Sequence, residues 1–387
     1  MLQFVIDPIP AHIETSYVAV FGWMRSEQPP ASVEVLADET PVYHELHSRL
    51  DLANLYPAEY TTGLYAVVDV AASRPQIEQN RGQLRLRVRV DHTLWFDQTV
   101  TVSDAALARA TDGLAYREAK REFVRTHAAC PACGAPLAIA SGRPEVITCS
   151  RCGTAFPQRT HAWTMIPGAA PVPRLLSTSV FAYSAEERAL IDDVAARGGM
   201  VLDFGAGLRQ TIEPRVVNLE IADYPTTDVV AASDRLPFVD GSFDAVITLH
   251  VLEHLRRPWR AAEEIARVLK PGAVALCTVP FVCPEHGFPD HFFNMTRSGL
   301  ASLFEGMTLE RHFMKGDAAP INGLQQLVST YYGNLPEPHR TTFGDVRIAD
   351  LVHTPLHELM VKDFVVNLPE HARWKLAAHT TVLVRKT

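Results

Sequence analysis

The stretch that decides the fold is Met200-Val-Leu-Asp-Phe-Gly-Ala-Gly207, an apolar run that ends in an aspartate and a Gly-x-Gly turn. A short apolar run that passes directly into glycines is typical of a buried parallel strand followed by a tight turn. Because the two glycines carry no side chain, a ligand can approach the backbone at the carboxyl edge of the sheet. A Gly-x-Gly turn alone is weak evidence for any particular ligand.

The segments on either side follow an order of helix, strand, turn, helix and strand. The helix after the turn must be very short, because only twelve residues separate Gly207 from Glu220. Before the turn, Ser184-Ala-Glu-Glu187 is a capping box that predicts a helix start, and Gly198-Gly199 predicts the end of that helix. After the turn, residues 215–220 form a second apolar strand that ends in Glu220, whose carboxylate suits the two hydroxyls of a ribose. This alternation predicts an α/β domain with a parallel sheet.

Four further segments follow in order along the chain. They are Asp234-Arg-Leu-Pro-Phe238, Gly241-Ser-Phe-Asp244, Leu252-Glu-His254 and Val268-Leu-Lys-Pro-Gly272. Together with the turn at Asp203, they make residues 185–310 resemble the class I S-adenosylmethionine-dependent methyltransferases, in the methyltransferase type 11-like branch. The resemblance implies a Rossmann-like fold and transfer of a methyl group from S-adenosylmethionine.

The resemblance also implies, position by position, which residues bind this cofactor. It places Asp203, Gly205, Ala206 and Gly207 around the methionine part, Glu220 on the ribose, Ser233, Asp234 and Leu236 beside the adenine, and Leu249 and His250 beside the transferred methyl group. The chain departs from the family pattern at Arg209, where a third glycine is common, and at Ala232, where an adenine-binding aspartate is usual. A dinucleotide such as NAD is less well matched, because both the third glycine and a full helix after the turn are missing.

A histidine-bearing loop, residues 279–294, follows the predicted fifth strand. Loops at this edge of a sheet hold substrates, and the resemblance places acceptor contacts in the same loop. Methyl transfer is an in-line displacement, so an acceptor hydroxyl must be aligned and must lose its proton, a task that suits a histidine titrating near ~6.5. The candidate catalytic residues are therefore His250, His286, Asp290 and His291, with His286 or His291 as the base. The alternative is that the ionisable groups of this loop are merely solvated.

Two C-x-x-C pairs, separated by fifteen residues, precede the α/β segment. Their members are Cys130, Cys133, Cys149 and Cys152. Four thiolates at this spacing suit a tetrahedral zinc ion, and a site with four protein ligands leaves no position for a catalytic water. The pattern predicts a structural zinc ribbon.

The chain divides into five parts by pattern. The first, residues 1–105, repeatedly alternates apolar and polar residues, most cleanly at residues 84–90, which predicts a β-sandwich of the Ig-like kind. The others are a helical connector (106–126), the zinc ribbon (127–165), a proline-bearing linker (166–183) and the methyltransferase domain (184–387). In the last, residues 308–314 and 380–385 predict strands six and seven, and the helical insertion between them predicts a lid over the acceptor pocket.

Length and composition bound the possible functions. The 387 residues carry a formal net charge of -8, which disfavours binding of long nucleic acids by electrostatics alone. The sequence contains no run of about 18 apolar residues and begins with no signal-peptide pattern, so we expect a cytoplasmic chain without a transmembrane segment.

Three functions remain open from the sequence. The first is O-methylation of a small-molecule or glycan-type acceptor. The second is methylation of an rRNA or tRNA base, since some such enzymes resemble this chain in placing a zinc module before the catalytic domain. The third is a non-catalytic scaffold, whose sandwich or ribbon binds a protein partner while a degenerate methyltransferase fold only packs.

Overall fold

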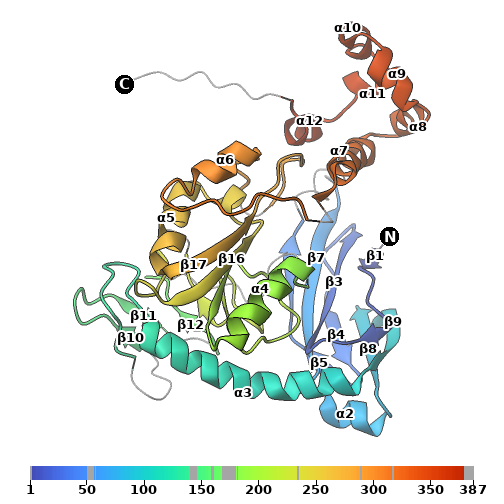
Figure 1. Ribbon diagram of the computed structural model, residues 1–387. Coiled ribbons are helices and arrows are strands. Elements are labelled where there is room, and N and C mark those ends of the chain that lie inside the picture. Colours follow the sequence, from blue (N-terminus) through green and yellow to red (C-terminus); the bar gives the residue numbers. More distant parts are fainter. Residues whose placement is uncertain are drawn as a thin grey trace.

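The computed structural model describes residues 2–49, 56, 58–139, 146–157, 161–167, 180, 182–232, 235–287, 290–315 and 318–378. Along the chain these residues form a β-sandwich, a long helix, a small ribbon, a parallel α/β sheet and a group of short helices (Figure 1). The parallel sheet and the antiparallel N-terminal region confirm the predicted fold class. In the part of the chain described here, no helix combines the length and apolarity needed to cross a bilayer.

The N-terminal region consists of two sheets packed face to face. The first has the order β1-β3-β7-β6 and the second the order β2-β9-β8-β4-β5. The bounds are β1 (Gln3–Ile6), β2 (His12–Ile13), β3 (Tyr17–Ser26), β4 (Val33–Ala37), β5 (Thr40–Val42), β6 (His44–Ser48), β7 (Tyr60–Asp69), α2 (Arg74–Gln79), β8 (Gln83–Val90) and β9 (Thr93–Val102). Inward side chains such as Val20, Leu64 and Leu86 form one apolar core between the sheets, as the alternating pattern requires.

The α/β region is built on a parallel sheet with the order β12-β15-β14-β13-β16-β17. The bounds are β12 (Trp163–Thr164), α4 (Ala185–Ala196), β13 (Val201–Phe204), β14 (Val216–Glu220), β15 (Val229–Val230), β16 (Phe243–Leu249), η1 (Leu252–His254), α5 (Pro258–Val268) and β17 (Leu269–Thr278). α4 covers one face through Ile191 and Val194, and α5 covers the other through Ile265. The order reverses between β13 and β16, which is where sheets of this kind bind ligands.

The ribbon is continuous with this sheet. Its hairpin is formed by β10 (Val146–Thr148) and β11 (Ala155–Pro157), and β12, which follows, pairs in parallel with β15. A single apolar core includes Cys130 and Phe156 of the ribbon together with Leu202 and Phe238 of the α/β region. A boundary at residue 165 therefore does not separate two independent folding units, because each part buries its apolar surface against the other.

One helix joins the sandwich to the ribbon. α3 (Asp104–His127) runs beneath the sandwich and the parallel sheet (Figure 1). In its second half the buried Lys120 donates hydrogen bonds to the carboxylate of Asp228 at 2.7 Å and to the carbonyl of Val216 at 3.0 Å. These bonds attach the helix to the beginning of β14 and to the residue before β15.

The connections between β13, β14 and β15 are short. The described residues 205–215 and 221–228 contain no helix, so the very short crossover helix expected after the turn is absent there. The sandwich packs against these connections, because Tyr65 of β7 shares a small core with Leu208 and Tyr224. The N-terminal region thus covers loops that crossover helices would otherwise shield.

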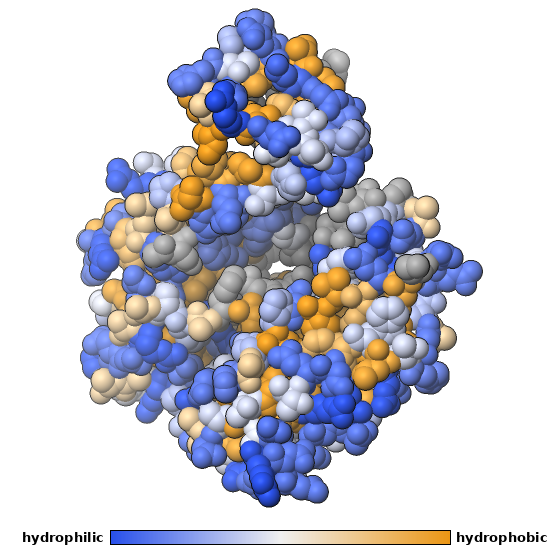
Figure 2. All heavy atoms as spheres, turned by 90° about the vertical axis from the view of Figure 1, so that its right-hand side faces the viewer, coloured by the Kyte–Doolittle hydropathy of each residue, from blue (hydrophilic) through white to orange (hydrophobic). Residues whose placement is uncertain are grey.

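The C-terminal part is a set of short helices. They are α6 (Arg297–Ser302), α7 (Pro320–Asn334), α8 (His339–Gly344), α9 (Ile348–His353), α10 (Leu356–Leu359), α11 (Asp363–Val366) and α12 (Glu370–Lys375). A small separate core with Leu335, Phe364 and Leu368 joins several of them. Figure 1 and Figure 2 show that α8 to α11 project from the body of the molecule, whereas α6 lies on the body near α5.

The prediction of a sixth strand at residues 308–314 is wrong. These residues are irregular and mostly exposed, and they pair with no strand of the described sheet. A segment becomes a strand of a sheet only where a neighbouring strand pairs with its backbone hydrogen-bonding groups. The predicted strand at residues 380–385 lies outside the described residues.

Candidate active site at the carboxyl edge of the sheet

The turn after β13 requires glycine. Gly205 has a φ of +72°, and a Cβ built on it would lie 2.2 Å from a methyl carbon of Val251. Its amide donates to the carbonyl of Leu219 on β14, and the amide of Gly207 donates to the carboxylate of Glu220 at 2.8 Å. The glycines therefore hold the ends of β13 and β14 close together.

Replacing Gly205 with alanine should destabilise the protein by about 2–4 kcal/mol, because a left-handed φ costs about 1–2 kcal/mol and the clash with Val251 adds an overpacking cost of similar size. Gly198→Ala is the matched control, since its φ is +73° and no atom lies within 4 Å of the added Cβ. Urea unfolding measures both variants. If both variants lost the same free energy of unfolding, the contact between the added Cβ and Val251 would not be destabilising.

Asp203 lies at the end of β13, and among the described residues only one of its two carboxylate oxygens accepts hydrogen bonds. Its Oδ2 accepts hydrogen bonds from the hydroxyl of Tyr183 at 2.6 Å and from Nε of Arg209 at 2.8 Å, whereas its buried Oδ1 has no hydrogen-bond partner among the described residues. Although burial works against the charged form, Asp203 holds the pKa of Arg209 above its ordinary value. Arg209, which stands at the position of the third family glycine, thus fills the space beside this carboxylate.

Glu220 closes the other side of the turn. Its Oε1 accepts from the amide of Ile221 at 2.7 Å, and its Oε2 accepts from Gly207. Burial raises the pKa of Glu220, while these two amides lower it. An acceptor-only carboxylate at the end of the second strand has the chemistry needed to bind two ribose hydroxyls.

The structure brings most of the predicted cofactor residues to one cleft. Its lining includes Gly205, Ala206, Gly207, Glu220, Leu249 and His250. Leu236 instead lies in the apolar core, with its amide bonded to the carboxylate of Glu264 at 2.9 Å. Ser233 and Asp234 lie outside the described residues. The adenine end of the site is therefore the part of the prediction that the described residues support least.

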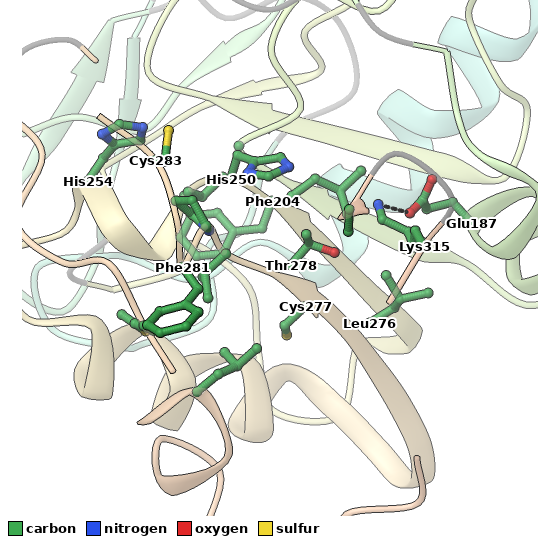
Figure 3. Close-up of a pocket in the computed structure, with 18 of the residues that line it drawn as sticks. Glu187, Phe204, His250, His254, Leu276, Cys277, Thr278, Phe281, Cys283 and Lys315 are labelled. Carbon is green, nitrogen blue, oxygen red and sulfur yellow. Dashed lines mark hydrogen bonds and ion pairs between the residues drawn. The ribbon is translucent and has the colours of Figure 1, made fainter. Parts of the chain in front are cut away.

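The cleft is large, about 3730 Å³, which is several times the roughly 300–1,000 Å³ of a typical small-molecule site. It has room for a cofactor and an acceptor together. Residues of the sandwich, among them His47, Arg49 and Tyr65, contribute to its lining. At the end opposite the histidines, Lys315 and Glu187 form a buried ion pair at 2.7 Å, which the sequence analysis did not identify (Figure 3).

The predicted His286 and His291 lie at the other end of the cleft, beside His254, and His250 lies nearer its middle (Figure 3). His250 directly follows β16 with a φ of +56°, and its Nδ1 lies 3.6 Å from a carboxylate oxygen of Glu253. The rings of His286 and His291 lie 4.3 Å apart. Asp290 contacts the group through its backbone carbonyl, which accepts from Nδ1 of His254 at 2.9 Å.

Sequence reasoning did not assign Glu253 and His254 to this group. Both belong to η1, and in the sequence they stood out only as members of the Leu252-Glu-His254 motif. His254 instead contacts the acceptor loop, with its ring 5.2 Å from that of His286. The Leu-Glu-His motif directly after a strand at the ligand-binding edge was the available signal.

Helices of the C-terminal group contact the same loop. The Cys283 thiol donates to the side chain of Gln326 on α7 at 3.2 Å, and the amide of Glu285 donates to the carbonyl of Lys375 on α12 at 2.9 Å. The insertion thus lies beside the predicted acceptor pocket, where a lid would be.

The four ribbon cysteines also come together. Cys130 and Cys152 have their sulfurs 3.7 Å apart, and Cys133 and Cys149 have theirs 3.6 Å apart. Sulfurs that share one tetrahedral ion at about 2.3 Å lie about 3.8 Å from one another, so this cluster could hold a metal ion.

Comparison with known proteins gives a consistent result. Residues 202–277 match the family model described as "Methyltransferase domain". An uncharacterized methyltransferase of Mycobacteroides abscessus is 31% identical over 133 residues, which cover 28% of this chain and 51% of that protein. One from Mycolicibacterium gilvum is 46% identical over 48 residues, covering 12% of this chain and 19% of that protein. The chain thus spans about half, or less, of the length of these curated relatives.

Among solved structures, a chain from the complex between the Haloferax volcanii Trm112 methyltransferase activator and a methyltransferase is 21% identical. The match covers 32% of this chain and 71% of that chain, with a TM-score of 0.23. The matched residues 202–277 contain the turn at Asp203, the carboxylate of Glu220 and the motif with His254. The chain therefore contains a methyltransferase domain of class I, centred on residues 202–277.

Proposed function

We propose that this protein is an S-adenosylmethionine-dependent methyltransferase that methylates a hydroxyl group of a small-molecule or glycan-type acceptor. The observation that carries the proposal is that the glycine turn after Asp203, the strand-end carboxylate of Glu220 and a histidine cluster line one cleft at the carboxyl edge of the sheet. Sheets with this strand order bind their ligands at that edge. The net charge of -8 agrees with an acceptor that is not a long nucleic acid.

The residues around the turn fit the cofactor. The unpartnered Oδ1 of Asp203 suits an ammonium group such as that of the methionine part, because a buried oxygen without a hydrogen bond is costly. Glu220 suits the ribose, and the side-chain-free Gly205 and Gly207 let a ligand lie against the backbone. When bound, S-adenosylmethionine supplies an electrophilic methyl group on a sulfonium sulfur.

On the acceptor side, the protein has to align an oxygen and remove its proton. His250 stands at the end of β16, half exposed, with Glu253 behind its ring. We assign His250 the role of proton acceptor and place His286, Asp290 and His291 in the loop that holds the acceptor. With the cofactor bound, the imidazole of His250 would take the proton that the acceptor hydroxyl loses as its oxygen receives the methyl group.

For the ribbon, we propose a structural zinc ion bound by Cys130, Cys133, Cys149 and Cys152. The two pairs of sulfurs are already close to tetrahedral spacing. With four protein ligands the site is closed, so the ion stabilises the fold and takes no part in methyl transfer. We accordingly propose that residues 1–165, which form the sandwich, the connector and the ribbon, have a structural role. The residues that carry out methyl transfer then all follow residue 184.

A non-catalytic role is the second candidate, and one observation favours it. Arg209 already occupies Oδ2 of Asp203 and neutralises its charge. If that ion pair blocked cofactor binding, the domain would have only a structural role, in a scaffold whose sandwich or ribbon binds a protein partner. Cofactor binding distinguishes the two candidates.

The cofactor affinity should fall on acidification. Because burial raises the pKa of Glu220 above its ordinary value of 4.5, this carboxyl takes up a proton at a higher pH than a solvated one. The ionised form accepts the ribose hydroxyls, so affinity is complete above the raised pKa and decreases as the pH falls through it. Calorimetric titration between pH 5 and pH 7 measures this, below the range of about 7.7–8.0 in which an α-amino group titrates.

Glu220→Gln is the matched variant for this measurement. It should bind the cofactor more weakly than the wild type at pH 7 and show a flatter pH profile between pH 5 and pH 7. An unchanged profile in Glu220→Gln would show that another group controls the pH dependence.

The acceptor class is tested by methyl transfer itself. The full-length, zinc-loaded protein is incubated with S-adenosylmethionine carrying a labelled methyl group and with cell extract separated into RNA, protein, glycan and small-molecule fractions. Label in the glycan or small-molecule fraction, reduced with Glu220→Gln at a limiting cofactor concentration, is the expected result. Label in RNA would favour base methylation instead, and no label in any fraction together with no cofactor binding would favour the scaffold.

A further inference from the structure

A second group of potential metal ligands lies in the cleft, apart from the cysteines. Ligand atoms of Glu253, His254 and His286 all lie within 4.8 Å of one another. Two imidazoles and one carboxylate are the donor set of divalent-metal sites that keep coordination positions open for a substrate. We propose that these three residues bind a divalent first-row transition-metal ion that in turn binds the acceptor's oxygen.

The buried carboxylate of Glu253 is the strongest single piece of support for a metal ion at this site. Its side chain is fully buried, and neither carboxylate oxygen has a hydrogen-bond partner among the described residues. The nearest cationic candidates, Nδ1 of His250 and Nε2 of His254, lie 3.6 and 3.9 Å from Oε1, which is beyond hydrogen-bond distance. A buried carboxylate without hydrogen bonds is costly, and a cation among these side chains removes that cost.

The two histidines are held as metal ligands usually are. Nδ1 of His254 bonds to the carbonyl of Asp290 at 2.9 Å, and Nδ1 of His286 bonds to the carbonyl of Pro284 at 3.0 Å. Ligand histidines typically donate one ring N–H to a carbonyl or carboxylate, which fixes the ring and leaves the other nitrogen for the metal. This leaves Nε2 of each ring to serve as the ligand atom, and Nε2 of His254 is the nitrogen that faces Glu253.

His291 is a positioning residue for this site. Its Nδ1 accepts a hydrogen bond from the amide of His286 at 3.2 Å, and its Nε2 lies 3.2 Å from the carbonyl of Phe293. Both ring nitrogens are therefore engaged with backbone. The loop also needs Gly287, because a Cβ there would lie 2.2 Å from the ring of His254.

The location gives the ion a role in the proposed reaction, and that role rests on the proposed function. Figure 3 shows His254 and Cys283 at one end of the pocket, with His250 next to them toward its middle. His286 is exposed, so the ion would have open positions on the solvent side for an acceptor. A divalent cation lowers the pKa of a hydroxyl that it binds, which helps His250 to take the proton.

Manganese binding tests the site without any methyl transfer. Mn²⁺ prefers nitrogen and oxygen ligands over thiolates, so it distinguishes this site from the cysteine cluster. Titration of the zinc-loaded, full-length protein with Mn²⁺, followed by electron paramagnetic resonance, should show one bound ion per chain. His254→Ala, His286→Ala and Glu253→Gln should each weaken binding at least tenfold, whereas His357→Ala, 83% exposed on α10, should bind like the wild type.

Two outcomes would overturn the proposal: a wild type that binds no Mn²⁺, or ligand variants that bind it as well as the wild type. His286→Ala removes an exposed side chain, so its thermal unfolding should match the wild type and its result does not depend on a folding defect. Gly287→Ala provides a second variant, which displaces the ring of His254 while keeping all three ligands. Because neither cofactor nor acceptor is present, a failure of methyl transfer does not affect this result.

Discussion

Replacing Cys130 with serine should abolish metal binding by the ribbon and unfold the parallel sheet along with it. Cys130 is fully buried and belongs to the same apolar core as Leu202 and Phe238. A structural zinc ion contributes about 10–16 kcal/mol of apparent free energy in small zinc modules, whereas a whole domain is stable by only about 5–15 kcal/mol. Because ribbon and sheet share one core and one strand ladder through β12, the loss should extend beyond the ribbon.

Zinc content by mass spectrometry and thermal unfolding measure this variant. Cys277→Ala is the matched control, since Cys277 lies on β17 away from the cluster and should leave both the zinc content and the cooperative transition in place. A wild type without metal, or a Cys130→Ser variant that melts like the wild type, would show that a metal ion in the ribbon does not stabilise the fold.

Replacing Lys120 with methionine should cost about 3–5 kcal/mol of folding free energy, the loss expected when one partner of a buried ion pair is removed. The side chains of Lys120 and Asp228 are 0% and 6% exposed, and they are 2.7 Å apart. Without Lys120, the one hydrogen-bond donor to Oδ2 of Asp228 that the described residues still provide is the amide of Asn218, at 2.8 Å. The carboxylate would then be buried with its charge uncompensated.

Urea unfolding gives the size of this loss. Arg109→Met is the matched control on the same helix, because Arg109 pairs with Glu14 at the surface and exposed pairs contribute about 0–1 kcal/mol. Adding Asp228→Asn to Lys120→Met should recover part of the loss, since the double variant leaves no buried charge. Equal losses for Lys120→Met and Arg109→Met would contradict the assigned role of the buried pair.

Local patterns predicted the central sheet and the turn. Strand, glycine turn and strand-end carboxylate lie within about twenty residues of Asp203, so their order in the sequence fixes their neighbourhood in space. The two cysteine pairs predicted the metal-binding cluster equally well, because the two thiols of each C-x-x-C pair are close together in any fold. The sandwich followed from alternation, as in residues 84–90, where Leu84, Leu86 and Val88 are all buried.

Contacts between distant segments were harder to predict. β12 has two residues and no periodicity, so only its pairing with β15 identifies it as a strand. His254 and His286 are separated by more than thirty residues, and their contact depends on how the acceptor loop folds back over η1. Residues 308–314 show the opposite error, because the strand predicted there has no strand partner in the described sheet.

The side chain of Arg209 was visible only as a departure from the family pattern. Its ion pair with Asp203 depends on a turn in which residues six positions apart meet, with Tyr183 completing the group from another segment. The sequence shows that a glycine is missing, whereas the structure shows what occupies the space. This is the feature on which the catalytic and the non-catalytic candidates differ.

The most direct test of the central claim is calorimetric titration of the zinc-loaded, full-length protein with S-adenosylmethionine. The account predicts one binding site per chain, weakened at least tenfold in Asp203→Ala and in Glu220→Gln and unchanged in Gly198→Ala. Absence of binding by a folded wild type would contradict the account, because the cleft at Asp203 and Glu220 would then not be a cofactor site.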